Sequence, residues 1–263
     1  MRDNELRKAW GQGTKTINGW CSIPAAFAAE VMAHQGFDSV TVDMQHGVVD
    51  YQAMVTMLQA ISTTPTVPMV RVPWLEAGII MKSLDAGAYG VICPMINSAE
   101  EAERLVGWCS YPPRGERSFG PIRATLYGGA DYPANANATV LKIAMIETRR
   151  ALDNLDAILA VDGLDGVYVG PSDLANSLGH PPRLDPIVAE VVEACQHIGR
   201  SAKAKGLFAG MHTGEPSYAS KVLGWGFDFC TIGSDSRFMA AKAHEVLAEA
   251  RSGVAAKAEM TTY

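Results

Sequence analysis

Eight short apolar segments, each followed by a helical pattern, restrict the fold of this chain more than any other feature. The segments span residues 16–22, 39–43, 67–72, 90–93, 142–147, 166–169, 207–211 and 227–232. Most are apolar throughout, as expected of parallel strands that are covered on both faces. Strands that alternate with helices form parallel βαβ units. Eight such units predict an α/β fold of the (β/α)₈ TIM-barrel type.

The helical patterns lie between the predicted strands, with one long exception. They span residues 25–35, 51–61, 76–84, 99–109, 150–161, 186–205, 216–223 and 234–251. The stretch 110–138 is rich in Pro, Gly, Asn and Tyr and is expected to form a long functional loop. An open doubly wound sheet is the main alternative fold, but the GxGxxG fingerprint that would favour it is missing from the sequence.

Length and charge narrow the class of protein further. The chain has 263 residues, and a TIM barrel fills about 250. We therefore expect a single domain over residues 1–263, with a barrel core from about 16 to 251. The formal net charge of −6 disfavours a nucleic-acid partner. No apolar run approaches the ~20 residues that cross a membrane.

Two further patterns bear on where the protein works. The N-terminal residues lack the apolar stretch of a secretory signal. The five cysteines are odd in number and show no CxxC spacing, which disfavours disulfide and Cys-ligated zinc sites. Both patterns predict a reduced, cytoplasmic protein.

Chemically active side chains recur where the predicted strands end. In TIM barrels the catalytic groups stand at the carboxyl ends of the strands. One His, one Arg, one Glu and one Asp follow different strands and are expected to converge on one rim, together with further polar residues. The full set of these strand-end residues is Asp43, His46, Arg71, Glu147, Asp173 and His212.

Glu147 and Asp173 follow neighbouring predicted strands. Two carboxylates without Cys or paired His suit a hard divalent cation such as Mg²⁺ or Mn²⁺, with positions left open for substrate. An exposed strand-end carboxylate for Glu147 and a helix N-cap for Asp173 are the structural alternatives. Because the two carboxylates are expected side by side, the sequence predicts a metal site.

The remaining strand-end residues suit acid–base and anion-binding roles. Arg71 is a candidate clamp for a carboxylate or oxyanion, and its alternative is a salt bridge to Asp43 or Glu147. His46 follows Asp43 by three residues, so the carboxylate could orient the imidazole as a general base. The alternative for His46 is a hydrogen bond to loop backbone. For His212, structural and substrate-binding roles remain open.

Six motifs in this order resemble the HpcH/HpaI aldolase family, whose members are metal-dependent class II pyruvate aldolases on a TIM barrel. The resemblance covers residues from about 20 to 235. The most specific parts are the Asp43-x-x-His46-Gly47 element and the segment VGPSDL. The motifs are Asp43–Gly47, Val70–Pro73, Asp85–Ala88, Arg117–Pro121, Ile146–Thr148 and Gly170–Leu174.

The resemblance implies a role for each matching residue. Glu147 and Asp173 would hold a divalent cation (Mg²⁺, Mn²⁺ or Co²⁺), and Arg71 would stabilise a pyruvate enolate. His46 paired with Asp43 would move protons, and Asp85 would act at a subunit contact. The implied substrate-binding residues are Trp20, Arg71, Gly170, Pro171, Ser172 and His212.

The resemblance also implies substrates and assembly. The substrates would be 4-hydroxy-2-oxo acids, or pyruvate and an aldehyde. The chain would form a homotrimer or homohexamer in which the last helix, 234–251, is exchanged between subunits. The only strand lysine, Lys142, begins its strand at the opposite rim, which disfavours a Schiff-base mechanism.

Two departures from the family pattern concern the substrate. Gln45 stands where many members carry Glu, and His212 stands where an apolar residue is expected. The aldehyde therefore stays open between succinic semialdehyde, a sugar-acid semialdehyde and an aromatic aldehyde, with Arg117, Arg123 and Tyr127 as candidate contacts. Two alternative functions remain. One is related chemistry on oxaloacetate, phosphoenolpyruvate or a thioester, and the other is a non-catalytic barrel that binds a keto acid.

Overall fold

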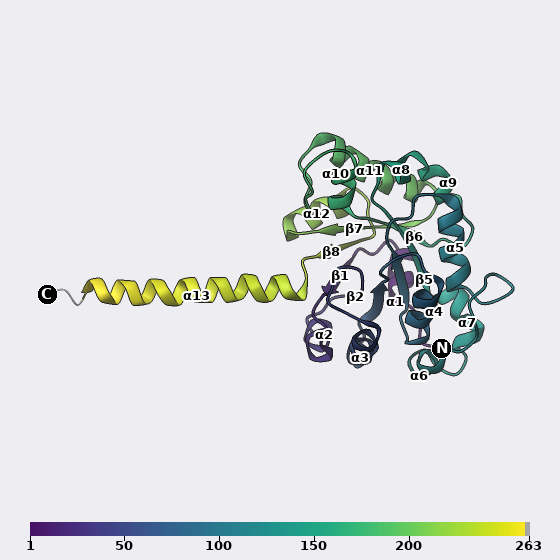
Figure 1. Cartoon of the computed structure of the whole chain (residues 1–263), viewed down its shortest axis with the longest axis horizontal. Coiled ribbons are helices and arrows are strands. Elements are labelled where there is room, and N and C mark those ends of the chain that lie inside the picture. The colour runs from purple at the N-terminus through teal and green to yellow at the C-terminus, as the bar shows by residue number, and fades with distance from the viewer. Residues whose placement is uncertain (261–263) are drawn as a thin grey trace.

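The computed structural model describes residues 1–260, with side chains through residue 252. Eight parallel strands form a closed barrel in chain order, and β8 pairs with β1 to complete it. This confirms the predicted TIM-type barrel (Figure 1). The strands are β1 (Thr16–Cys21), β2 (Ser39–Asp43), β3 (Val67–Arg71), β4 (Gly90–Cys93), β5 (Leu141–Ile146), β6 (Gly166–Val169), β7 (Phe208–Thr213) and β8 (Phe229–Ile232).

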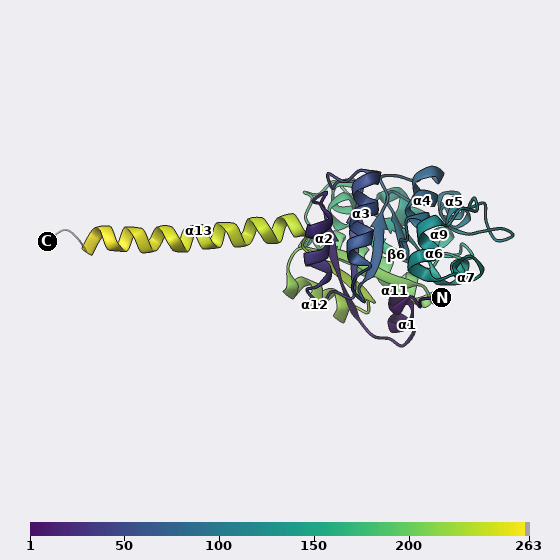
Figure 2. The same cartoon turned by 90° about the horizontal axis from the view of Figure 1, so that it is seen from below.

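Helices connect the strands and cover the outside of the barrel (Figure 2). In chain order they are α1 (Glu5–Gly11), α2 (Ala26–Ala33), α3 (Tyr51–Ile61), α4 (Ala77–Asp85), α5 (Ala99–Cys109), α6 (Ile122–Gly128), α7 (Tyr132–Thr139), α8 (Arg149–Asp153), α9 (Leu155–Leu159), α10 (Pro171–Ser177), α11 (Ala189–Ala204), α12 (Pro216–Gly224) and α13 (Asp235–Met260).

The apolar strand sequences follow from burial on both faces. Every residue of β2, β3, β4, β5 and β6 is buried, either inside the barrel or against the helices. Side chains of a strand alternate between these two environments, so both alternating sets must be mainly apolar. The polar strand residues that remain therefore need partners inside the barrel.

Helix α1 closes the barrel end at which the strands begin, and the sequence analysis did not predict it. Its Trp10 stacks on Phe229, with ring centroids 4.6 Å apart. The Trp10 indole N–H donates to the Thr16 hydroxyl at 2.8 Å. The strand carboxyl ends are thus left as the open end of the barrel.

The stretch 110–138 is not the loop that the composition predicted, because it contains α6 and most of α7. Arg117 anchors it with hydrogen bonds to Asp85 (2.6 Å) and to the Tyr132 hydroxyl (3.0 Å). Arg123 donates to the carbonyl of Ala86, shortly before β4 begins. These residues lie toward the strand-start end of the barrel, so the prediction that Arg117, Arg123 and Tyr127 contact the aldehyde in their own chain's pocket is wrong.

Two predicted helices have different bounds. The helix expected over 150–161 is divided into α8 and α9 at Asn154. The helix expected from residue 186 begins at Ala189 as α11. The carboxylate of Asp185, the residue before the expected helix, accepts hydrogen bonds from the backbone N–H groups of Gly214 and Glu215 before α12.

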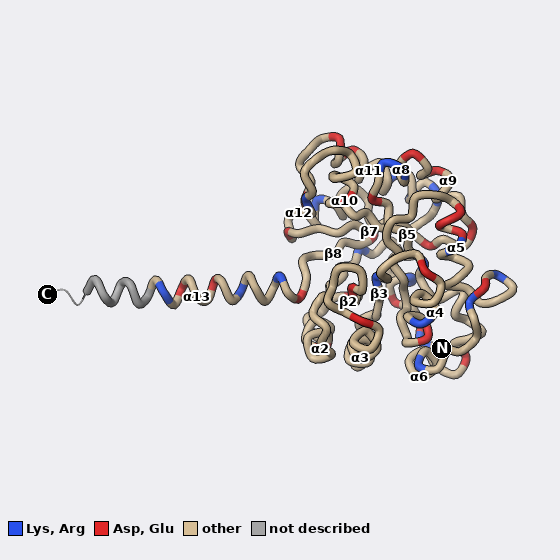
Figure 3. The backbone as a smooth tube through the Cα atoms, in the orientation of Figure 1, with Lys and Arg blue, Asp and Glu red and all other residues tan. Residues whose placement is uncertain are grey.

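Helix α13 leaves the barrel and projects away from it (Figures 1 and 2). Asp235 fixes its first turn, since its carboxylate accepts from the backbone of Ser22 and Ile23. The side chains of residues 236–252 are exposed, so the barrel itself ends near Asp235 and not near 251. Basic and acidic residues both occur along the helix (Figure 3).

None of the helices in the described part of the chain has the length and apolar character needed to cross a membrane.

Candidate active site

A cavity of about 300 Å³ opens at the carboxyl ends of the strands and collects most of the predicted site residues. Its lining comes from β3, β5, β7, the start of α10 and the segments that follow β2, β5, β6 and α10. The lining residues are His46, Arg71, Met145, Glu147, Gly170, Pro171, Ser172, Asp173, Leu184 and His212. Asp43 and Trp20 contact Arg71 from behind, whereas Asp85 lies elsewhere, in its pair with Arg117.

Arg71 is held rigidly by a buried carboxylate. Its Nε and Nη2 donate to the two oxygens of Asp43 at 2.8 and 2.7 Å. The indole N–H of Trp20 donates to the same carboxylate, and the guanidinium lies 4.8 Å from the Trp20 ring centroid. Burial acts to raise the pKa of Asp43, but the hydrogen bonds and charge of Arg71 outweigh it and lower that pKa.

The salt bridge to Asp43 that was considered as an alternative for Arg71 therefore exists, but it does not use all of the N–H donors of the guanidinium. Within the described residues, Nη1 of Arg71 makes no hydrogen bond, while the side chain lines the cavity. The structure thus presents a charged, oriented donor at the cavity wall.

The expected pairing of Asp43 with the His46 imidazole is not found. Asp43 instead accepts from the backbone N–H groups of Gln45 (3.0 Å) and His46 (3.4 Å). The carboxylate shapes the turn after β2, where a Cβ on Gly47 would lie 2.2 Å from the Asp43 carbonyl oxygen. The His46 side chain is exposed at the cavity, with its ring free of hydrogen bonds to the described residues.

Glu147 is a buried carboxylate with one oxygen available. Its Oε1 accepts from the backbone N–H of Met95 at 2.8 Å, and only 1% of the residue is exposed. Burial and the charge of Asp173 raise the pKa of Glu147 to about 7, against the Met95 hydrogen bond, which lowers it. Oε2 faces Gly170, where a Cβ would lie 2.2 Å from it.

Asp173 lies in the first turn of α10 and is exposed, and the N-cap residue of that helix is Gly170. The N-cap alternative for Asp173 is therefore wrong. The two carboxylates of Glu147 and Asp173 line one cavity, as predicted.

The donor set fits a divalent cation of the magnesium type. Mg²⁺ prefers oxygen ligands and is often held by one or two carboxylates, with water and substrate completing its shell. Among the side chains that the structure describes, no three His, Cys, Asp or Glu groups gather closely enough to enclose a metal. Sites of the zinc type, which need three or four protein ligands, are thus disfavoured in the described part.

His212 also lines the cavity, and its side chain differs in chemical character from the carboxylates of Glu147 and Asp173. Its Nδ1 lies 3.1 Å from the Tyr168 hydroxyl, and its ring meets the Trp20 ring edge-on at 4.8 Å. Burial, and the charge of Arg71, lower the pKa of His212 to about 3. Sequence reasoning missed Tyr168, although it is the one polar side chain in the strand segment Gly166–Val169.

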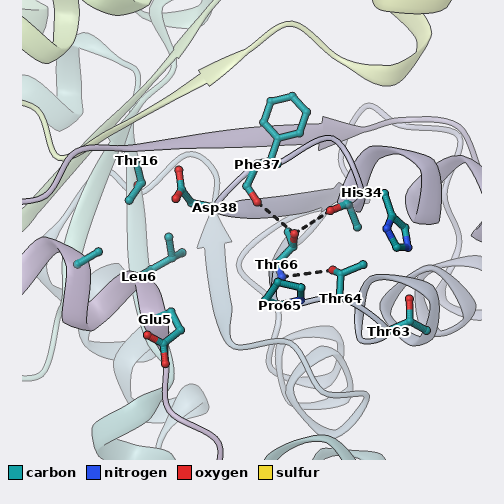
Figure 4. Close-up of a pocket in the computed structure, with 13 residues that line it drawn as sticks. Glu5, Leu6, Thr16, His34, Phe37, Asp38, Thr63, Thr64, Pro65 and Thr66 are labelled. Carbon is teal, nitrogen blue, oxygen red and sulfur yellow. Dashed lines mark hydrogen bonds between the residues drawn. The ribbon is translucent and has the colours of Figure 1, made fainter.

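A larger cavity, of about 600 Å³, lies at the opposite end of the barrel, where β1, β2 and β3 begin (Figure 4). Several of its polar side chains are already engaged in hydrogen bonds. The Thr66 hydroxyl donates to the carbonyls of Ala33 and Phe37, and Asp38 accepts from the Ile17 N–H. This end of a TIM barrel usually serves stability, and the bonding here fits that role.

Two relatives with named activities cover most of the chain. A hydroxypyruvate/pyruvate aldolase of Rhizorhabdus wittichii is 45% identical over 249 residues, which are 95% of this chain and 99% of the relative. A 2-keto-3-deoxy-L-rhamnonate aldolase of Salmonella gallinarum is 35% identical over 240 residues, covering 90% and 89% of the two chains.

The structure and a family model agree with these relatives. A crystal structure of an HpcH/HpaI aldolase/citrate lyase family protein from Burkholderia cenocepacia superposes with a TM-score of 0.88 at 31% identity, covering 94% of this chain and 99% of the other. The family model for HpcH/HpaI aldolase/citrate lyase matches residues 20–241. The chain therefore belongs to the HpcH/HpaI aldolase/citrate lyase family.

Proposed function

We propose that this protein is a class II aldolase that cleaves and forms 4-hydroxy-2-oxo acids. The observation that carries the proposal is the meeting of Arg71, Glu147 and Asp173 in one cavity at the strand carboxyl ends. This arrangement offers positive charge and oxygen ligands to a 2-oxo acid. The names of the two relatives support aldol chemistry on such acids.

Glu147 and Asp173 are the residues that would hold a divalent cation, Mg²⁺, Mn²⁺ or Co²⁺. When bound, the cation supplies positive charge that stabilises the enolate form of the 2-oxo acid. The free Oε2 of Glu147 and the exposed carboxylate of Asp173 support this role.

Arg71 binds the 2-oxo oxygen and stabilises the negative charge that develops there when the C3–C4 bond breaks. Its two hydrogen bonds to Asp43 fix the guanidinium before the substrate arrives. The arginine therefore loses little conformational freedom on binding.

His46 takes the proton from the C4 hydroxyl, directly or through one water molecule. Its ring is exposed at the cavity and free to reach a substrate. The aldehyde leaves, and the enolate is then protonated at C3 to give the 2-oxo acid. Ser172 lies in the first turn of α10, so its backbone N–H lacks an intrahelical acceptor. This N–H orients the substrate carboxylate, with Gly170 and Pro171 beside it.

The chain forms a homo-oligomer, a trimer or hexamer, in which α13 packs on a neighbouring subunit. In the part of that helix whose side chains are described, four large apolar side chains are exposed, and the helix projects away from its own barrel (Figure 1). Asp85 would act at a subunit contact, and the 26% exposure of its side chain in the pair with Arg117 supports this role.

The test is pyruvate release from a panel of 4-hydroxy-2-oxo acids, coupled to lactate dehydrogenase. We expect release that varies with the aldehyde half, since cleavage then occurs at C3–C4. Binding of 2-oxo acids without release of product from any substrate would favour the non-catalytic barrel and would contradict the proposal. Release only from oxaloacetate would indicate decarboxylation instead.

A further inference from the structure

A chain of hydrogen bonds runs through the barrel interior and ends at His212 in the cavity. Asn18 of β1 donates its amide N–H to the Thr231 hydroxyl at 2.8 Å. Tyr168 of β6 donates its hydroxyl to the same Thr231 oxygen at 2.5 Å. The Tyr168 oxygen also lies 3.1 Å from Nδ1 of His212. Three buried side chains from separate strands therefore fix the position of one imidazole.

The proton count along this chain defines the tautomer of His212. A tyrosine hydroxyl carries one proton, and that of Tyr168 is directed to Thr231. The contact with His212 is therefore a hydrogen bond only if Nδ1 carries a proton and donates it. A neutral imidazole has a single N–H, so Nε2 is left with a free lone pair.

Two further observations support a neutral, immobile ring. Burial and the neighbouring charge of Arg71 lower the pKa of His212 to about 3, so the ring is uncharged at neutral pH. The Trp20 ring contacts it edge-on at an interplanar angle of 84°. With so low a pKa the lone pair is a poor general base, although it can still accept a hydrogen bond.

The free lone pair lies in a cavity that it shares with the carboxylates of Glu147 and Asp173 and the guanidinium of Arg71. Nε2 makes no hydrogen bond to any residue that the structure describes, yet His212 lines the cavity. Arg71 is a donor, and the carboxylates of Glu147 and Asp173 suit a cation. A neutral hydroxyl group on the substrate is the complement of Nε2.

We propose that His212 Nε2 accepts a hydrogen bond from a substrate hydroxyl, and that the enzyme thereby prefers hydroxylated substrates over their deoxy analogues. The inference deepens the proposed aldolase function and rests on it. The hydroxyl has two sources: the C3 hydroxyl of a 3-hydroxy-2-oxo acid, or the 2-hydroxyl of a hydroxyaldehyde.

The tautomer is tested directly by long-range ¹H–¹⁵N NMR of the folded protein labelled with ¹⁵N-histidine. A His212→Phe variant assigns the ring signals by their loss. We expect a protonated Nδ1 and an unprotonated Nε2 at neutral pH. An Nε2–H tautomer or a charged ring would overturn the proposal, and this outcome is independent of whether aldol product forms.

The preference is tested by measuring kcat/KM for two matched pairs of substrates. One pair compares hydroxypyruvate with pyruvate as donor, and the other compares glycolaldehyde with acetaldehyde as acceptor. In His212→Phe we expect the hydroxyl preference to fall about tenfold in one pair, which identifies the source of the hydroxyl. His212→Gln restores an acceptor near the Nε2 position and should recover part of the preference.

His197→Phe, on the exposed face of α11, is the matched control and should leave both ratios unchanged. Equal losses on the hydroxylated and deoxy substrates in His212→Phe would overturn the hydroxyl contact. If no pair gave product with the unaltered protein although the panel of 4-hydroxy-2-oxo acids released pyruvate, the inference alone would be refuted, and no product in either assay would refute the proposed function as well. Product with ratios insensitive to His212 would refute the inference alone.

Discussion

Arg71 reaches the candidate active site with two of its donors already bound to the buried carboxylate of Asp43. A buried pair of this kind adds little net stability, because desolvation of both groups opposes their attraction. What it provides here is orientation. The guanidinium presents its remaining face to the cavity in one geometry, as an oxyanion-stabilising group requires.

We predict that Arg71→Ala lowers kcat/KM for pyruvate release by at least about 100-fold, the usual loss when one preorganised donor is removed. Because this change strands Asp43 without its partner, thermal unfolding is measured in parallel. Arg71→Lys keeps the charge but not the fork and should also lose most of the activity. Arg104→Ala on the exposed face of α5 is the control. Near-normal turnover in a folded Arg71→Ala variant would contradict the proposed role of Arg71 in stabilising the developing negative charge.

We predict that Glu147→Gln weakens Mn²⁺ binding at least tenfold, because a neutral amide replaces the buried carboxylate that supplies a ligand oxygen. Titration followed by electron paramagnetic resonance measures free Mn²⁺ directly, without any enzymatic turnover. Glu103→Gln, an exposed site on α5, should bind as the unaltered protein does. Equal affinity in the Glu147 and Glu103 variants would place the metal elsewhere.

Individual site residues differ in how far the sequence predicted them. Arg71 and Glu147 were predictable because the strand carboxyl ends of a barrel share one rim. The partner of His46 was not, since a spacing of three residues does not show which way Asp43 points, and Arg71 competes for that carboxylate more strongly than a neutral imidazole would. Tyr168 was missed because its partners Thr231 and His212 are distant in sequence.

The position of the Glu147 carboxylate depends on the residue that joins β6 to α10. Gly170 directly follows β6 and serves as the N-cap residue of α10. Its lack of a side chain leaves room for Oε2 of Glu147, which an added Cβ would approach to 2.2 Å. Gly170 thus determines the position of the proposed metal ligand Glu147, although the glycine has no side chain that could bind the metal.

We expect Gly170→Ala to weaken Mn²⁺ binding about tenfold while the charge of the site stays the same. The methyl group must displace the Glu147 carboxylate, and ligand geometry matters for metal affinity. The measurement is the same Mn²⁺ titration, with circular dichroism to establish folding. Gly224→Ala, where an added Cβ meets nothing within 4 Å, is the matched control and should bind normally. Unaltered binding in Gly170→Ala would mean that Oε2 is not a ligand.

At the level of elements, strands were predicted better than the connections between them. The strand segments are apolar on both faces, a pattern that burial alone produces. Helix α1 escaped notice because its seven residues bury only Leu6 and Trp10. Helices α6 and α7 lie in a stretch of low helix propensity and are stabilised by tertiary contacts, such as that of Arg117 with Asp85 and Tyr132.

At the scale of the whole molecule, the long helix α13 projects away from the barrel (Figure 1). Along α13, the side chains of Phe238, Met239, Val246 and Leu247 are between 41% and 59% exposed. The sequence predicted this helix but could not show that it departs from the barrel. The residue pattern indicates that a segment is helical, but it does not indicate where the helix lies. Its exposure supports the proposal that a neighbouring subunit covers it.

We predict that the double variant V246E/L247E lowers the mass of the particle in sedimentation experiments, because two charges replace apolar side chains on the face proposed to be buried between subunits. Glu249→Lys alters charge on the same helix without removing an apolar contact and is the control. A monomeric unaltered protein, or a double variant of unchanged mass, would contradict the proposed packing.

The central claim is that a divalent cation held by Glu147 and Asp173 assists the cleavage of a 4-hydroxy-2-oxo acid. The most direct measurement is pyruvate release, coupled to lactate dehydrogenase, after exhaustive chelation and again after adding Mg²⁺, Mn²⁺ or Co²⁺. The account predicts that chelation abolishes release and that at least one cation restores it. Full release by the chelated protein would contradict the claim.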